Sequence, residues 1–230
     1  MGRKATGLAL FAGFALAAAA AGYALAIRPR LLAWGATVEE RYRPYPGDDL
    51  VPNPQWSYTH AITIYAPAAA IWPWLVQRGY RRGGWYTCDG LYKLIGADEF
   101  VDGHSARRII PELQGLQAGD SLPLAPGVEM PVAASEPERL LLVHAEGDPS
   151  RPGQPPDPAL PGYLNISWLW LLEPLTPEIT RLIDHLRLDY HANAAAQIMQ
   201  RLAIEPGAFV LDRKMLLGIK ERAEGAKQEG

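Results

Sequence analysis

Cysteine is almost missing from this chain of 230 residues, because Cys88 is the only one. A single thiol excludes an intramolecular disulfide and a metal site built from several cysteines. Charge is also sparse: charged side chains are 20% of the residues, and the formal net charge is −3. The 22 lysines and arginines are spread along the chain rather than concentrated in one stretch. The sequence therefore does not predict a nucleic-acid-binding protein.

The familiar enzyme signatures are missing as well. The sequence contains no P-loop, no GxGxxG dinucleotide fingerprint, no GxSxG nucleophile elbow and no HExxH zinc motif. Catalytic residues stay unassigned on this ground, and no cofactor is predicted. Oxygen and imidazole groups do gather at Asp98, Glu99, Asp102 and His104. Their spacing matches no established metal-binding loop and is typical of a solvated acidic loop, so no metal is predicted.

A long apolar run lies near the N-terminus. Residues 5–27 carry no charged side chain. As a helix this run would span about 34 Å, enough for a bilayer core. Basic residues on both sides favour an uncleaved anchor over residues 1–30, with the side of the membrane undetermined. The alternatives are a signal peptide cleaved after Ala24-Leu25-Ala26 and a soluble helix.

The rest of the chain divides into a connector and a domain. Residues 31–56 are rich in proline, glycine and charge, which predicts an extended connector that wraps onto the domain. Residues 57–230 are expected to form the domain itself. Hydrophobic residues make up 48% of the sequence, which supports a substantial core.

The pattern within residues 57–230 predicts an α+β domain. Alternation over 57–65 predicts a strand, Pro67 is expected to open a helix that ends near Arg78, and a second short helix is expected over 85–95. Short strands are expected near 106–110, 119–124, 128–135 and 139–146, and longer ones over 164–172 and 179–190. The tail is expected to be helical, with an interruption at residues 205–207. A long amphipathic helix laid against a curved antiparallel sheet would cover its apolar face and leave a cavity between them.

Three stretches carry a resemblance to a known family: 71–77 (IWPWLVQ), 83–89 (GGWYTCD) and 205–220 (EPGAFVLDRKMLLGIK). Together with the order of elements they resemble an uncharacterised, often membrane-anchored branch of the START-like superfamily, also called SRPBCC or polyketide cyclase/dehydrase and lipid-transport-like. The resemblance covers roughly residues 35–224 and implies the helix-grip fold. The chain departs from the family pattern at Thr87-Cys88 and at Ala208. The motifs carry no known catalytic role, so the resemblance assigns no active-site residues.

Candidate ligand-binding residues come from aromatic and ionisable side chains placed on the expected inner face. Trp85, Tyr86 and Asp89 follow a glycine pair and suit the mouth of a cavity. The wall is expected to come from apolar side chains, namely Trp72, Trp168, Trp170 and Leu182. Each of these residues also fits an ordinary core position.

Ionisable residues on the same faces supply weaker candidates. Asp184 shares strand parity with Leu182, and His60 shares it with Ile62, so each could face the cavity and serve acid–base chemistry. The alternative for both is a strand end or bulge. Arg213, on the terminal helix, could bind an anionic head group or lie on an exposed face.

The leading hypothesis is a membrane-tethered module that binds or transfers a hydrophobic small molecule, such as a lipid, a polyketide or an isoprenoid. The second is a cyclase, dehydrase or hydrolase that uses the same cavity, with Asp184, His60 and Asp89 as candidate acid–base groups. The third is a structural or interaction domain with a filled core. Protein partners stay unknown, and fold alone does not decide among the three.

Overall fold

The computed structural model describes residues 18, 21–87, 105–151 and 153–225. Asp89, the acidic group at 98–104 and most of the apolar run 5–27 lie outside the described residues. Within the described part of the chain, no helix has the length and apolar character needed to cross a bilayer.

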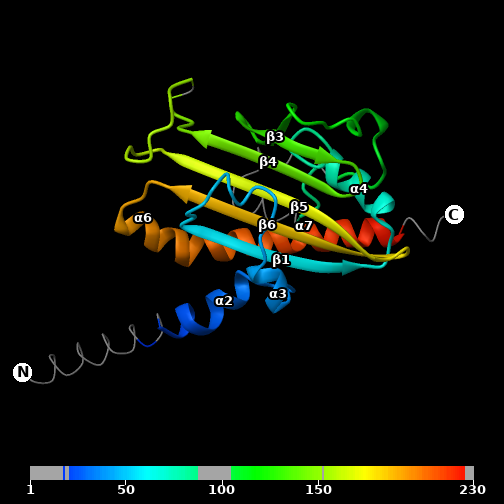
Figure 1. Ribbon diagram of the computed structural model, residues 1–230, viewed down its shortest axis with the longest axis horizontal. Coiled ribbons are helices and arrows are strands. Elements are labelled where there is room, and N and C mark those ends of the chain that lie inside the picture. Colours follow the sequence, from blue (N-terminus) through cyan, green and yellow to red (C-terminus); the bar gives the residue numbers. More distant parts are fainter. Residues whose placement is uncertain (1–17, 19–20, 88–104, 152, 226–230) are drawn as a thin grey trace, which may run out of the picture.

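The centre of the fold is one six-stranded antiparallel sheet in the order β1-β6-β5-β4-β3-β2 (Figure 1). The first strand thus returns to pair with the last. The strands are β1 (Trp56–Ile64), β2 (Ser121–Ala125), β3 (Val128–Glu136), β4 (Leu140–Gly147), β5 (Leu164–Thr176) and β6 (Ile179–Tyr190).

A long C-terminal helix, α7 (Glu205–Gly225), lies behind the sheet in Figure 1 and packs on α4 and β1. The predicted α+β arrangement of a sheet covered by a long terminal helix is confirmed, and it is consistent with the expected helix grip. The other helical segments are η1 (Tyr23–Ile27), α2 (Arg28–Leu31), α3 (Val38–Tyr42), α4 (Ala68–Gln77), η3 (Pro111–Leu113), α6 (Ala194–Met199) and η4 (Gln200–Ile204).

The inner face of the sheet forms the main core with α4 and α7. Side chains alternate along a strand, so Trp170 and Leu172 on β5 and Leu182 on β6 point to the same side. All three are at most 2% exposed. Burying side chains of this kind stabilises the fold by about 2 kcal/mol each. The parity predicted for β1, β5 and β6 is confirmed.

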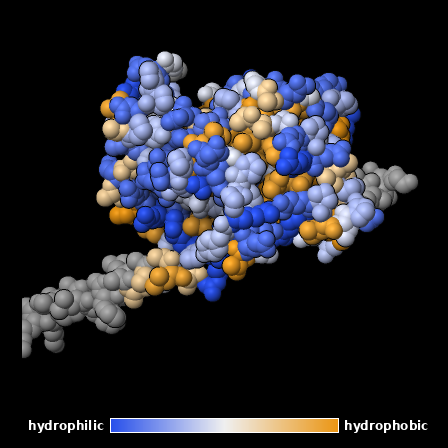
Figure 2. All heavy atoms as spheres, viewed as in Figure 1, coloured by the Kyte–Doolittle hydropathy of each residue, from blue (hydrophilic) through white to orange (hydrophobic). Residues whose placement is uncertain are grey.

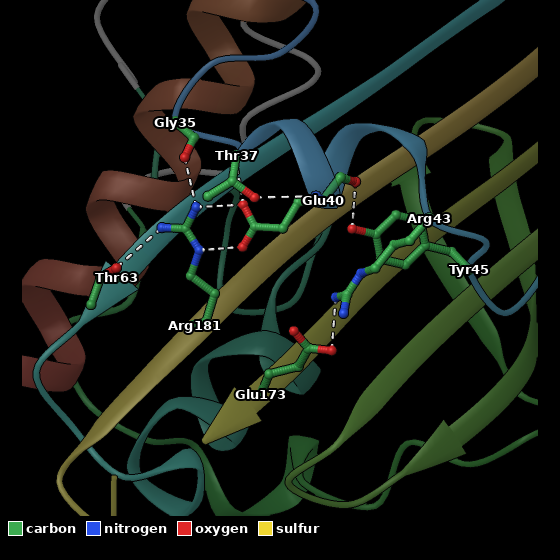
Figure 3. Close-up of polar contacts among 8 residues, drawn as sticks. All are labelled: Gly35, Thr37, Glu40, Arg43, Tyr45, Thr63, Glu173 and Arg181. Atoms are coloured by element: carbon green, nitrogen blue, oxygen red, sulfur yellow. Dashed lines mark hydrogen bonds and ion pairs between the residues drawn. The ribbon is translucent and has the colours of Figure 1, made fainter. Parts of the chain in front are cut away.

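The outer face is covered too, by the segment between α2 and β1. Tyr45 from this segment packs with Leu142, Leu169 and Ile183 of the sheet in a second apolar cluster. Arg181 on β6 fastens the segment: its guanidinium bonds Glu40 twice, at 2.7 and 2.8 Å, and the Gly35 carbonyl at 2.6 Å (Figure 3). Residues 31–56 thus include the helix α3 and cover the outer face of the sheet. The alternation of side chains along the strands had indicated that this face is polar.

Two expected elements differ from the structure. The strand expected near 106–110 is wrong, because this segment bonds a side chain rather than a neighbouring strand: the Ile110 amide donates to Gln77 Oε1 at 2.9 Å. In the expected helix over 85–95, the described residues 85–87 are not helical, and the rest lie outside the described residues.

The interruption expected at residues 205–207 is also wrong, because α7 begins at Glu205 and runs through Pro206. The irregularity lies one turn earlier, in η4, a π-type turn. Proline has no N–H and its ring collides with the carbonyl four residues before it in a regular α-helix. A widened π turn relieves that collision and lets the helix continue.

Candidate ligand-binding site

A cavity of about 280 Å³ lies between the inner face of the sheet and α7. This volume is near the lower end of small-molecule pockets, which span roughly 300 to 1,000 Å³. Its lining is mostly apolar and consists of Trp56, Tyr58, Trp85, Thr87, Leu124, Trp168, Leu186, Ala208, Leu211, Asp212 and Met215.

Tryptophans form one wall of the cavity. The rings of Trp85 and Trp168 stack with centroids 6.2 Å apart and planes 8° apart. Trp168 in turn contacts Trp170, whose centroid is 4.4 Å away. Trp168 and Trp170 are two residues apart on β5, so both point inward, and Trp85 reaches them from the loop after α4. The result is a rigid aromatic surface suited to an apolar or ring-shaped ligand.

Directly behind this wall, a carboxylate is held by both indoles. The Nε1 atom of Trp168 donates to Asp184 Oδ1 at 2.7 Å, and that of Trp170 donates to Asp184 Oδ2 at 2.8 Å. The register of β5 and β6 explains the geometry, since Trp170 lies directly opposite Asp184. Asp184 is 0% exposed. A buried carboxyl group in a protein interior requires such partners.

Asp184, a histidine (His60) and a second carboxylate (Asp212) together form the polar centre of the fold. His60 Nδ1 contacts Asp212 Oδ2 on α7, while His60 Nε2 is 2.7 Å from the Leu31 carbonyl. Because a carbonyl only accepts, Nε2 carries a hydrogen and donates it. Tyr58 stacks on the His60 ring with centroids 4.1 Å apart. Asp212 also lies near enough to Asp184 for each carboxyl group to shift the pKa of the other, so α7 and the sheet meet through the two acids.

Burial displaces the pKa values of this centre. It raises the pKa of Asp212 to about 7, against the opposing effects of Asp184 and Arg78. It also raises the pKa of Asp184 above its ordinary value, and the neighbouring Asp212 charge adds to that effect. Burial lowers the pKa of His60. Two carboxyl groups in contact hold one proton between them near neutral pH, because both cannot be charged in a desolvated site.

Arg78 balances the remaining charge. Its guanidinium lies 3.3 Å from the centroid of the Trp170 ring, and Nη1 donates to the Leu75 carbonyl at 3.0 Å. Arg78 is 0% exposed, and burial lowers its pKa to about 9. One arginine cation against one carboxylate, with a neutral His60 and one protonated carboxyl group, makes the centre electrically neutral.

The residues proposed from the sequence fall into three groups. Trp85 and Trp168 line the cavity. Six others do not line it. Of these, Trp72, Tyr86, Trp170 and Leu182 pack in the main core, and Asp184 lies behind the tryptophan wall. Arg213 stacks on Trp34 at 5.1 Å and is not part of the lining. Asp89 lies outside the described residues.

Asp212 and Arg78 were not singled out as centre residues by the sequence argument. The signal for Asp212 is its helical spacing, because Ala208, Asp212 and Met215 fall on one face of α7 and all three line the cavity. Arg78 gives no comparable signal, since an arginine at the end of a helix is ordinarily exposed.

No protein-family model matches the chain, and no curated protein matches it. Solved structures similar to it include a conserved protein from Geobacillus kaustophilus, at 16% identity and a TM-score of 0.40, covering 74% of this chain and 97% of that one. The Zhui aromatase/cyclase from a Streptomyces species matches at 18% identity and a TM-score of 0.38, covering 74% and 93%.

A hypothetical protein from Helicobacter pylori matches at 11% identity and a TM-score of 0.46, covering 82% of this chain and 99% of that one. At these scores the likenesses carry no argument about activity. The function is therefore argued from the cavity and its polar centre.

Proposed function

We propose that this chain is a membrane-tethered, START-like protein that binds a hydrophobic small molecule in the cavity between the sheet and α7. Lipids, polyketides and isoprenoids are the candidate classes. The observation that carries the proposal is the cavity of about 280 Å³, walled by stacked tryptophans and aliphatic side chains. An apolar ligand gains about 25 cal/mol for each Å² of apolar surface that it removes from water.

The cavity also argues against a domain with a filled core. Its lining comes from β1, β2, β5, β6, α7 and the loop after α4, so the hollow lies between the sheet and the helix that covers it. An empty apolar cavity forfeits packing contacts on every wall. A ligand that fills it restores them.

Naphthalene tests this binding directly. We expect saturable binding of naphthalene to the full chain by calorimetry, and we expect Leu211→Trp to abolish it because the larger ring fills the cavity from α7. Val210→Trp is the matched control, since Val210 is the preceding residue on the same helix, is 43% exposed and does not line the cavity. Using the same detergent throughout cancels partition of naphthalene into micelles. Equal binding by the wild type and Leu211→Trp would contradict the proposal.

Exposed apolar side chains support the tether. Six of them lie where the N-terminal segment meets the end of α6: Leu25, Ile27, Ile198, Met199, Leu202 and Ile204, each at least 48% exposed. The two segments are joined by Arg28 and Glu205 at 2.7 Å and by Tyr23, whose hydroxyl donates to the Arg201 carbonyl at 2.5 Å. Figure 2 shows hydrophobic residues at this start of the described chain. These side chains would face lipid if residues 5–27 insert in a bilayer.

Alkaline extraction and mass spectrometry test the tether. We expect the chain to stay with the membrane pellet after carbonate washing and to keep residues 5–27 in its intact mass. A released protein whose mass begins beyond Ala26 would instead show a cleaved signal peptide.

The polar centre supports a second candidate function, acid–base catalysis on the bound molecule. Asp212 lines the cavity, contacts His60, and has a pKa raised by burial to about 7, which suits a general base near neutral pH. Its carboxylate would take a proton from the carbon next to a ketone, and the electron pair of the C–H bond would move into the enolate.

Exchange of hydrogen for deuterium in tetralone, a ketone of suitable shape, tests this second function. In deuterated buffer, deuterium that appears at the α-carbon of bound tetralone with wild-type protein, and not with Asp212→Asn, supports catalysis. Bound tetralone that gains no deuterium contradicts it.

A further inference from the structure

The polar centre offers acceptors rather than donors to whatever fills the cavity. Three donors near the wall are engaged: both indole N–H groups of Trp168 and Trp170 bond Asp184, and His60 Nε2–H bonds the Leu31 carbonyl. The indole N–H of Trp56, which lines the cavity, has no acceptor among the described residues. A ligand hydroxyl suits such a site, because its hydrogen donates and its oxygen accepts. Because a neutral His60 carries its hydrogen on Nε2, its Nδ1 atom accepts the remaining proton of the carboxyl pair from Asp212 Oδ2. Asp212 Oδ1 then keeps only lone pairs, so it is an acceptor.

One oxygen of Asp212 also lacks a hydrogen-bond donor. It is 6% exposed, it lines the cavity, and Oδ1 receives no N–H or hydroxyl from the residues that the structure describes. A ligand that fills the cavity removes the last water from this carboxylate. A desolvated acceptor without a donor weakens binding, and does so more when it is charged. The ligand must therefore supply the donor.

The net charge of the polar centre limits the class of ligand further. The centre is neutral with one proton on the carboxyl pair, and the Arg78 cation is held on the far side of the wall over Trp170. An anionic ligand at Asp212 would place two carboxylates together without a facing cation. Tyr58 and Thr87, the other lining residues with hydroxyl groups, can donate or accept and so do not select against a donor.

Resting on the binding function proposed above, we infer that the ligand is an apolar alcohol or phenol whose hydroxyl group donates a hydrogen bond to Asp212, and not a carboxylic acid. Its hydrocarbon part lies against Trp85 and Trp168. The hydrogen bond between this buried acceptor and the ligand hydroxyl fixes the orientation of the ligand. It also favours ligands with a hydroxyl group over ligands without one.

Four probes of one shape test the inference by calorimetry on the full chain near pH 7: naphthol, its methyl ether, naphthalene and naphthoate. Wild-type protein is expected to bind naphthol roughly tenfold or more tightly than the methyl ether, because only naphthol donates a hydrogen bond to the unpartnered Asp212 Oδ1. Naphthoate is expected to bind more weakly than naphthalene.

A variant pair locates the effect. In Asp212→Asn the amide can itself donate, so the preference for naphthol over the ether should fall to within about twofold, and naphthoate should gain affinity. Arg213→Gln, the next residue on α7, should keep the wild-type preference because it does not line the cavity.

The outcomes separate this inference from the function beneath it. Wild-type protein that binds naphthalene but prefers the ether or naphthoate to naphthol overturns the inference and leaves the binding function standing. Failure to bind any of the four probes overturns the binding function itself. Since the ranking is measured on wild-type protein, the test does not depend on the folding of Asp212→Asn.

Discussion

At the scale of single residues, the interior is organised around Asp184. Three strands and a helix contribute its environment: two indoles from β5, the register with β6, His60 from β1 and Asp212 from α7. Buried ionisable groups cost stability unless they are paired. Here they are paired with one another and with the two indole N–H groups, beside the cavity.

Removing this carboxylate should destabilise the fold. In Asp184→Asn the amide keeps only one oxygen acceptor, so one indole N–H loses its partner. We expect the free energy of unfolding in urea to fall by about 1–3 kcal/mol. Asp49→Asn, at an exposed position, should change it by no more than about 0.5 kcal/mol. Equal effects at the two positions would refute the structural role of Asp184.

Asp212 should leave a signature in the pH dependence of stability. Its pKa rises from 3.8 to about 7 on folding, so between these values the folded state binds a proton that the unfolded state lacks. The stabilisation is complete below about pH 4 and is lost as pH rises through 7. His60, with its lowered pKa, acts in the opposite sense below pH 6.5, and Asp184, Arg78 and Tyr58 also face the centre.

The difference between wild type and Asp212→Asn isolates this effect. Unfolding of both proteins in urea at a series of pH values should show wild type losing stability relative to the variant as pH rises from about 4 to 7. A difference that is constant over this range would show that Asp212 has an ordinary pKa.

At the scale of elements, a glycine sets how closely α7 approaches the chain after α4. A Cβ atom at Gly218 would lie 2.5 Å from the Tyr86 carbonyl oxygen and 2.8 Å from the Tyr86 Cβ atom. Backbone at that distance cannot move aside cheaply. The absence of a side chain at Gly218 therefore allows α7 to pack closely against the loop that carries Trp85.

Gly218→Ala should therefore destabilise the protein by about 1–3 kcal/mol, despite the better helix propensity of alanine. Gly207→Ala on the same helix is the control, because its Cβ would meet no atom within 4 Å. It should stabilise the protein by up to about 1 kcal/mol. Thermal unfolding of both variants checks the contrast, and a stabilising Gly218→Ala would show that the approach is looser than described.

Elements were also the scale at which sequence prediction worked best. Alternating side chains located β1, β5 and β6 with their correct faces, and Pro67 marked the start of α4. The strand prediction for 106–110 failed because the backbone there bonds the Gln77 side chain and the Gly83 carbonyl rather than a neighbouring strand, and no local pattern reveals such partners. The predicted interruption at 205–207 was wrong because the sequence shows a helix-breaking proline, Pro206, but not the wider π turn before it that accommodates this proline.

At the scale of the whole molecule, both faces of the sheet are covered, one by α7 and the other by the segment before β1. The sequence indicated that this segment would wrap onto the domain, but not which strand would hold it. Arg181 and Glu40 are far apart in sequence, and the polar outward face of β6 gave no sign of an ion pair. Likewise, the meeting of His60, Asp184 and Asp212 depends on tertiary pairing that strand and helix periodicity cannot supply.

Loss of the Arg181 bonds should loosen the N-terminal segment without emptying the cavity. In Arg181→Ala the partly buried Glu40 carboxylate loses two hydrogen bonds, and the Gly35 carbonyl loses one. We expect faster protease cleavage within residues 31–56 and retained naphthalene binding. Arg139→Ala, which removes an exposed ion pair with Glu136, should leave the cleavage rate unchanged. Equal cleavage of both variants would show that Arg181 does not hold the segment.

The central claim is that the cavity holds an apolar molecule, and native mass spectrometry of the full chain released from cell membranes tests it most directly. Wild type and Val210→Trp are expected to carry a stoichiometric small molecule that denaturing extraction identifies as an apolar alcohol or phenol, whereas Leu211→Trp is expected to carry none. The same molecule retained in equal amount by Leu211→Trp would contradict the account, because its binding place would then lie outside the cavity.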